Sequence, residues 1–126
     1  MNALWVAIGG ALGAVGRYAV SLWVTPLTSG SWPLATLLVN VAGSLGIGVV
    51  FVLLERGLLH GDLRYFLVIG VFGGFTTFST FSLELLQIVE QGDWSVALQY
   101  AFASCASCFL GVGLGAAIAR QSLSSL

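Results

Sequence analysis

Long apolar runs alternate with short polar connections along the whole chain, and their lengths predict four membrane-spanning helices. Each run is close to the ~20 residues that a helix needs to cross the hydrocarbon core of a bilayer. The polar connections cover residues 26–32, 55–63 and 91–93. We therefore expect an all-α membrane protein with one four-helix transmembrane domain over residues 1–126. Its spans are expected at about 3–25, 33–54, 64–90 and 94–119.

The third apolar run contains the strongest departure from an uninterrupted helix. Residues 70–82 read GVFGGFTTFSTFS, so a glycine pair and five hydroxyl residues lie inside a segment long enough to cross a bilayer. Irregular backbone at membrane depth is tolerated only where protein or a wet cavity satisfies its free N–H and C=O groups. We expect the third helix to be broken at 73–77, at mid-membrane, and the break to form a site for a polar ligand or an ion.

Small residues recur four positions apart in several spans. This spacing lets the backbones of neighbouring helices approach closely, so it predicts a tightly packed bundle. The pairs are Gly9 with Gly13, Ser44 with Gly48, and Gly111 with Gly115.

The composition agrees with a membrane protein and excludes several function classes. Hydrophobic residues make up 58% of the chain and charged residues 7%, whereas soluble domains carry about a quarter charged residues. The net charge is −1, so no basic patch for nucleic acid is expected. No positively charged segment precedes the first apolar run, which argues against a cleaved secretory signal. Because so small a chain encloses little interior, we expect an oligomer.

The few charges near the span ends orient the chain only weakly. Arg56, Arg64 and Arg120 lie on the side that also holds the N-terminus, and the opposite connections carry no Arg or Lys. The positive-inside rule would place both termini in the cytoplasm. Glu55 and Asp62 lie among these arginines, however, so insertion in both orientations stays open.

Few polar side chains fall within the spans, and most leave a structural and a functional interpretation open. Arg17 is able to hold backbone carbonyls, pair with an acid or attract an anion. Asn40 is suited to an interhelical hydrogen bond or to a pore wall. Tyr100 and Ser104 share a face of the fourth span, as packing groups or as an aqueous track. Glu84 is the one acid well inside a span.

The remaining reactive groups do not form a recognisable catalytic or metal site. Cys105 and Cys108 form a C-x-x-C pattern, but it lies inside an apolar helix without a His or acidic cluster nearby, so neither a redox motif nor a metal site is expected. No nucleophile with a base and an orienting group stands out, so we expect no enzyme. Hydroxyls, an amide and aromatic rings instead predict a small-ion channel or transporter. Ring edges favour anions and ring faces favour cations, and the scarcity of acids slightly favours an anion.

The segment 73–82, GGFTTFSTFS, closely resembles the signature of the bacterial Fluc (CrcB) fluoride channels. Further similarity covers the first-span glycines with Gly16 and Arg17, the segment TLLVN at 36–40 with Gly43, and Tyr100 with Ser104. The resemblance extends over essentially the whole chain. It implies a fluoride-selective passive channel in the bacterial plasma (inner) membrane that exports fluoride from the cytoplasm. It also implies an antiparallel, dual-topology homodimer with two pores.

The resemblance further implies roles for individual residues. The pore and fluoride positions would be Asn40, Phe78, Ser79, Thr80, Phe81, Tyr100 and Ser104. Main-chain carbonyls of Gly73 and Thr76 would hold a structural sodium ion, Na⁺, at the centre of the dimer. From the residues themselves, we expect structural roles for Arg17 and Gly74, and attraction of an ion stays open for Arg17. Relatives commonly have a second small hydroxyl residue one turn after Ser104, where this chain has Cys108, so the role of that position stays open.

Two other functions remain as alternatives. A small dual-topology, proton-coupled multidrug exporter would also have four spans, but it would be expected to carry an acid in the first span, where this chain has Arg17 and no acid. A non-transporting membrane scaffold is opposed by the predicted break, because packing alone does not require one.

Overall fold

The computed structural model describes residues 1–30 and 32–125, and its secondary structure there is helical. Four stretches are long and apolar enough to span a membrane, namely Asn2–Leu27, Leu34–Glu55, Asp62–Glu90 and Trp94–Ser124, which confirms the prediction of an all-α protein with four such helices. The elements are α1 (Asn2–Val24), the 3-10 turn η1 (Thr25–Leu27), α2 (Leu34–Glu55), α3 (Asp62–Arg64), the π-helical η2 (Tyr65–Phe72), α4 (Gly73–Phe75), α5 (Phe78–Glu90) and α6 (Trp94–Ser124).

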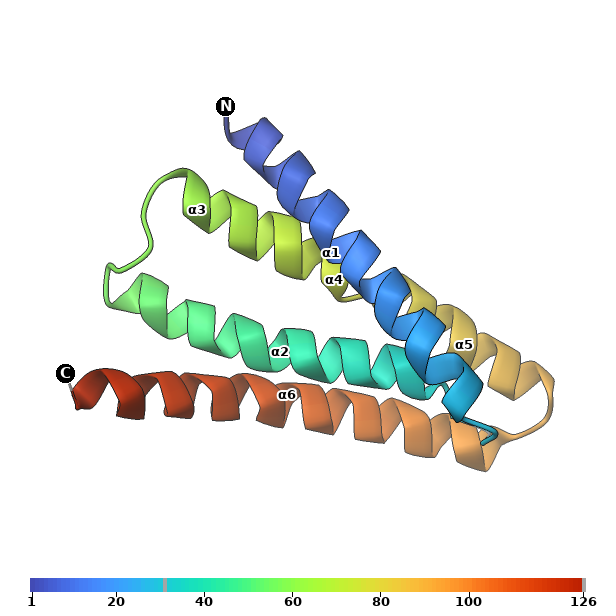
Figure 1. Cartoon of the computed structure of the whole chain (residues 1–126). Helices are drawn as coiled ribbons and strands as arrows, with labels where there is room; N and C mark the ends of the chain where they lie inside the picture. Colours follow the sequence, from blue (N-terminus) through green and yellow to red (C-terminus); the bar gives the residue numbers. More distant parts are fainter. Residues whose placement is uncertain (31, 126) are drawn as a thin grey trace.

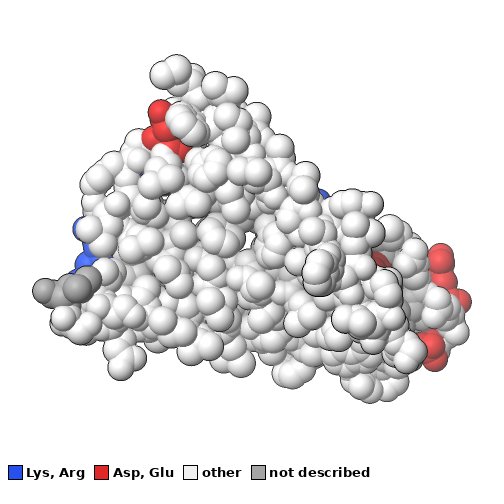
Figure 2. All heavy atoms as spheres, in the orientation of Figure 1, with Lys and Arg blue, Asp and Glu red and all other residues white. Residues whose placement is uncertain are grey.

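The four stretches alternate in direction, so that both termini lie at the same end of the molecule as the connection between α2 and α3 (Figure 1). Helices α2 and α6 run side by side along their length, and α1 crosses the third stretch. Charged side chains gather mostly at the two ends on the face drawn in Figure 2, and an uncharged surface lies between them. This distribution is the one that a bilayer selects.

Glycines hold α1 against the first half of the third stretch. A Cβ at Gly9 would overlap the carbonyl oxygen of Phe66, and one at Gly13 would overlap the carbonyl oxygen of Val71. Gly70 faces the backbone of Gly9 in turn. Because only hydrogen atoms separate these backbones, the predicted close approach of small residues is confirmed for this pair of helices.

Helices α2 and α6 meet along a seam, a line of close contact between their backbones, which also depends on glycines. Gly48 lies against the carbonyl of Val112, and Gly115 lies against the carbonyl of Leu45. At one end of this seam, Arg120 Nη2 lies 3.2 Å from Glu55 Oε2, and both side chains are half exposed. The two tight seams leave the second half of the third stretch, α5, to contact its neighbours through side chains.

The helix of the third stretch is interrupted at Thr76 and Thr77, later than expected. Thr76 is extended, with ψ 156°, and Thr77 is extended, with φ −149° and ψ 119°. The expected break at 73–77 was wrong in its first half, because Gly73–Phe75 is helical. Gly74 packs on Gly10, where a Cβ would lie 2.5 Å from the carbonyl oxygen. This glycine therefore allows the third stretch to pack closely on α1.

Candidate functional site

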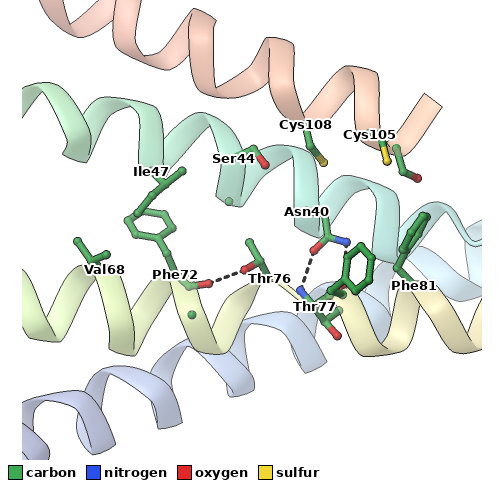
Figure 3. Close-up of a pocket in the computed structure, with 14 residues that line it drawn as sticks. Asn40, Ser44, Ile47, Val68, Phe72, Thr76, Thr77, Phe81, Cys105 and Cys108 are labelled. Carbon is green, nitrogen blue, oxygen red and sulfur yellow. Dashed lines mark hydrogen bonds between the residues drawn. The ribbon is translucent and has the colours of Figure 1, made fainter. Parts of the chain in front are cut away.

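A pocket of about 430 Å³ opens beside the interruption of the third stretch (Figure 3). Its wall comes from α2, from both halves of the third stretch and from α6. None of the residues that line it is charged. Four of the predicted site residues line it together with both predicted carbonyl positions: Asn40, Phe78, Phe81 and Ser104, with Gly73 and Thr76.

Asn40 holds the interrupted backbone in place. Its Oδ1 accepts a hydrogen bond from the Thr77 N–H at 2.7 Å, and its Nδ2 donates to the Thr77 carbonyl at 3.0 Å (Figure 3). A primary amide has two donor hydrogens, so this pair of bonds leaves one for the pocket. Asn40 is therefore an interhelical hydrogen-bonding group that also lines a cavity, and its place in a pore wall stays a prediction.

The side chain of Thr77 caps the N-terminus of α5. Its Oγ1 accepts from the Thr80 N–H at 3.1 Å, which is the bond that a Thr N-cap makes to satisfy a free donor of the first helical turn. The same oxygen lies 3.0 Å from Thr80 Oγ1 and 3.4 Å from Ser79 Oγ. The hydroxyl-rich sequence thus explains why a helix restarts directly after the interruption.

The two phenylalanines of the pocket differ sharply in exposure. Phe81 is 6% exposed, whereas Phe78 is 77% exposed. Their ring centroids lie 5.5 Å apart at an interplanar angle of 50°, and Phe81 also lies 5.3 Å from the ring of Tyr100. Among the described residues, Phe81 therefore has two aromatic neighbours of this kind and Phe78 has one.

Ser104 contributes a hydroxyl without a partner. Its Oγ is buried and makes no hydrogen bond to any residue in the described part of the chain. An unsatisfied buried polar group costs about 1–3 kcal/mol, so a ligand able to accept its hydrogen would recover that loss. Ser104 lines the uncharged pocket from α6, and the same pocket wall also contains Phe81 and Cys108.

Tyr100 does not line this pocket, although it was predicted alongside Ser104. The side chain is fully buried, and its hydroxyl donates to Glu84 Oε2 at 2.8 Å. Thr36 Oγ1 donates to the other oxygen, Oε1, at 2.6 Å. Glu84 lines a separate pocket of about 460 Å³ with Gln87 and the start of α2.

Sequence reasoning found Glu84 as an isolated acid and missed both hydroxyl partners. A signal was present, because Thr36 lies one turn before Asn40 and Tyr100 lies one turn before Ser104. Each pair places two polar side chains on one face of an apolar helix. Two such faces on neighbouring helices point to a shared polar partner between them, which the structure identifies as Glu84.

A third pocket, of about 280 Å³, contains two further predicted residues, Arg17 and Thr80. Thr77 lines this pocket as well as the uncharged one, so the interruption separates them. Arg17 is half-buried and makes no ion pair among the described residues. Ser79 is exposed and lines neither pocket. The predicted pore residues are therefore divided between two sides of the interruption.

The backbone before the interruption presents oxygens without their usual helical donors. In a continuous helix the Thr77 N–H would bond the carbonyl of Gly73, but here it donates to Asn40 Oδ1. Thr76 is itself extended, so its carbonyl leaves the helix direction. Both residues line the uncharged pocket, and Gly73 is exposed. Carbonyl oxygens are ligands that hard cations prefer.

Comparisons with known proteins identify relatives over nearly the whole chain. The sequence profile described as CrcB-like protein, Camphor Resistance (CrcB), matches residues 4–116. A protein of Roseiflexus sp. (strain RS-1), named fluoride-specific ion channel FluC, is 43% identical over 95% of this chain and 98% of its own. Proteins with the same name from Thermus thermophilus and Coxiella burnetii are 44% and 42% identical. They cover 91% and 96% of this chain, and 94% and 99% of their own lengths.

Proposed function

The chain belongs to the CrcB family of multi-pass bacterial membrane proteins, and from that membership we propose that it is a passive fluoride channel that exports fluoride from the cytoplasm. The single observation that carries the proposal in the structure is the buried, unpartnered hydroxyl of Ser104, a residue that lines an uncharged pocket. A dehydrating anion needs hydrogen-bond donors, and a pocket without acids does not repel it. The relatives' names supply the identity of the ion.

Hydrogen-bond donors and aromatic rings of the pocket solvate the anion together. The Ser104 hydroxyl and the second Nδ2 hydrogen of Asn40 donate to fluoride. The edges of the Phe78 and Phe81 rings carry partial positive charge and support an anion that lies in their plane. Fixed charge is absent from this wall, so the ion is held weakly enough to leave again, as conduction requires.

Arg17 acts from the opposite side of the interruption. Arg17 lines a pocket together with the hydroxyl residues Thr77 and Thr80. Opposite charge raises the local concentration of an ion at a cleft that it lines. We assign this pocket to the attraction of fluoride towards the interrupted helix, and the uncharged pocket to its passage.

The membrane potential supplies the driving force in this proposal. Hydrogen fluoride is neutral, so it enters cells from acidic surroundings and ionises in the cytoplasm. An inside-negative potential then pushes the anion outwards, with about 2.3 kcal/mol per unit charge for each 100 mV. Passive conduction in this direction requires neither a nucleotide nor a proton gradient.

The proposed assembly is an antiparallel, dual-topology homodimer. Two features support a second copy at the uncharged pocket: the pocket is open to the outside, and Phe78 at its wall is 77% exposed. The weak orienting charge supports insertion in both directions, since Arg56 and Arg64 lie among acids at the same end.

A structural sodium ion at the dimer centre is part of the same proposal. The donor set fits Na⁺, because the carbonyls of Gly73 and Thr76 are hard oxygen ligands at an interrupted helix. Those two residues would hold the ion, and a second copy would supply further oxygens. Bound there, the cation would neutralise the partial negative charge of helical carbonyls close to the path of an anion.

Removal of sodium tests that part directly. Exchange of Na⁺ for N-methyl-D-glucamine is expected to lower the melting temperature of the purified dimer, because a ligand that binds only the folded state stabilises it by about 2.7 kcal/mol at a hundred times its dissociation constant. Thermal unfolding in detergent measures the shift, and restoration by Na⁺ but not by K⁺ is the control. An unchanged melting temperature would refute the sodium site and leave fluoride conduction untouched.

The conduction test uses purified protein in liposomes loaded with potassium fluoride. Valinomycin makes the membrane permeable to K⁺, so charge build-up does not stop fluoride efflux. A fluoride electrode follows the efflux. We expect rapid fluoride loss without chloride loss from matched potassium chloride vesicles, at equal pH on both sides. Efflux that requires a pH gradient would favour the proton-coupled exporter instead, and a folded dimer without efflux would favour the scaffold.

A further inference from the structure

Two thiols face the uncharged pocket from α6. Cys105 and Cys108 both line it, and Figure 3 shows their sulfur atoms directed from α6 towards the space beside Asn40 and Phe81. Both are free thiols; Cys105 is exposed and Cys108 is half-buried. The C-x-x-C pattern that the sequence placed in an apolar helix is therefore accessible from a cavity.

The helical spacing is wrong for a disulfide and suitable for a bridging metal ion. Side chains three apart on a helix have Cβ atoms about 5–6 Å apart, whereas a disulfide requires about 3.5–4.5 Å. Two metal–sulfur bonds of about 2.3 Å each extend the bridge enough to close the longer gap. An ion that accepts two sulfur ligands fits where a direct S–S bond would distort the helix.

The surroundings limit the choice of metal ion. Within residues 1–30 and 32–125, no group of three His, Cys, Asp or Glu side chains is placed to hold a metal. Structural zinc needs four such ligands, so the pair does not complete a zinc site. Soft thiolate ligands select Cu⁺, which binds at sites with few ligands.

We propose that Cys105 and Cys108 form a two-coordinate site for Cu⁺ that opens into the uncharged pocket. Binding converts two thiols into thiolate ligands and releases two protons, while copper stays in the +1 state throughout, so no oxidant or reductant is consumed. The bound ion with its two thiolates carries one net negative charge at the pocket wall. That charge and the lost space both oppose an anion in the pocket, so Cu⁺ blocks flux; this consequence rests on the proposed function.

Binding is tested without any transport measurement. The purified protein in detergent competes anaerobically for Cu⁺ with a chromophoric Cu⁺ chelator, and the absorbance of the chelator complex is followed. We expect one Cu⁺ per chain, and loss of this stoichiometric binding in Cys105→Ser and in Cys108→Ser. Ser107→Ala, which changes a hydroxyl between the two cysteines, is the matched control and is expected to bind as the unaltered chain does. Equal binding by all four proteins, or none by the unaltered chain, would overturn the proposal.

A second measurement avoids dependence on the serine variants. Cu⁺ is expected to protect both thiols of the unaltered protein from maleimide, as read by intact mass. Equal labelling with and without Cu⁺ would contradict the site even if the variants failed to fold. In fluoride-loaded vesicles, Cu⁺ is expected to slow efflux by the unaltered protein and not by Cys105→Ser. Unaltered efflux with Cu⁺ bound would refute the block, whereas vesicles that never conduct fluoride would contradict the proposed function and leave the binding result intact.

Discussion

The two halves of the third helical stretch have nearly opposite characters. The first half, residues 65–75, is apolar and packs its backbone on α1 through glycines. The second half, Phe78–Glu90, carries hydroxyls and the half-buried acid Glu84, and hydrogen bonds link it to side chains from α2 and α6. One half fixes position by contact between backbones, and the other presents chemical groups.

The difference teaches how a small membrane protein keeps an interrupted helix in place. Contact between backbones leaves no room for rearrangement, because a protein interior is close-packed. The first half therefore acts as a rigid support, and the free backbone groups at its end stay aligned with Asn40. The second half then needs only side-chain bonds to hold its functional groups at the pockets.

The largest expected effect comes from a change in the rigid half. Gly13→Leu places a Cβ onto the backbone of Val71 and Phe75, where only movement of the whole helix relieves the overlap. Overpacking typically costs about 1–3 kcal/mol and occasionally more, and we expect the upper end or failure to fold. Size-exclusion chromatography and thermal unfolding measure the loss. Gly10→Ala on the same helix is the control, because its Cβ would meet nothing within 4 Å; equal stability of both variants would contradict the rigid support.

The next effect tests the junction between the halves. Asn40→Leu keeps the size of the side chain but leaves the Thr77 N–H and carbonyl without partners, which costs about 1–3 kcal/mol for each buried group. We expect a lower melting temperature together with reduced fluoride efflux. Gln99→Leu, which removes an exposed amide bond to Ser95, is the matched control and should change neither. An unchanged melting temperature of Asn40→Leu would mean that the interrupted backbone keeps its conformation without the two hydrogen bonds from Asn40.

The rigid half was largely predictable from the sequence, because the patterns that specify it are repeated and involve residues close together in the chain. Apolar runs define the spans, and small residues four apart define close seams, as Gly9 and Gly13 show. The extent of the interruption was predicted less well. Glycines break helices in water, but Gly74 is needed here for contact with Gly10, so packing overrides its low helix propensity.

For the second half, the sequence predicted which residue types carry function, but it did not predict which side chains they contact. The signature identified Phe78 and Phe81, which meet at one pocket with Ser104 of α6, whereas Thr80 lines the pocket on the opposite face of the interruption. Glu84 accepts hydrogen bonds from Thr36 and Tyr100, which lie 48 and 16 positions away in the chain. The polar faces of α2 and α6 indicate that a shared partner lies between them, but which side chain it is depends on how both helices are rotated against α5.

A smaller effect on stability and a large one on flux are expected at Phe78. Phe78→Ile exchanges an exposed ring for an aliphatic group, so little burial is lost and the melting temperature should change little. Loss of the positive ring edge is expected to reduce efflux by about a hundredfold, which corresponds to about 2.8 kcal/mol. Phe102→Ile is the control, since that ring is equally exposed, at 76%, on α6 and lies outside the pocket. Equal flux in both variants would remove Phe78 from the conduction path.

The smallest structural change tests the pocket that the second half shares with α6. Ser104→Ala deletes a buried hydroxyl that has no partner among the described residues, so the folded state loses no hydrogen bond and should be as stable or more stable. A hydrogen bond to a charged group is worth about 1.5–3 kcal/mol, so efflux should fall by about ten- to a hundredfold. Ser107→Ala is the matched control, because that hydroxyl donates to the Ala103 carbonyl of its own helix. A variant with unchanged stability and reduced flux places Ser104 in contact with the ion, since no packing defect would account for that combination. Unchanged flux would instead show that its unpartnered hydroxyl has no part in conduction.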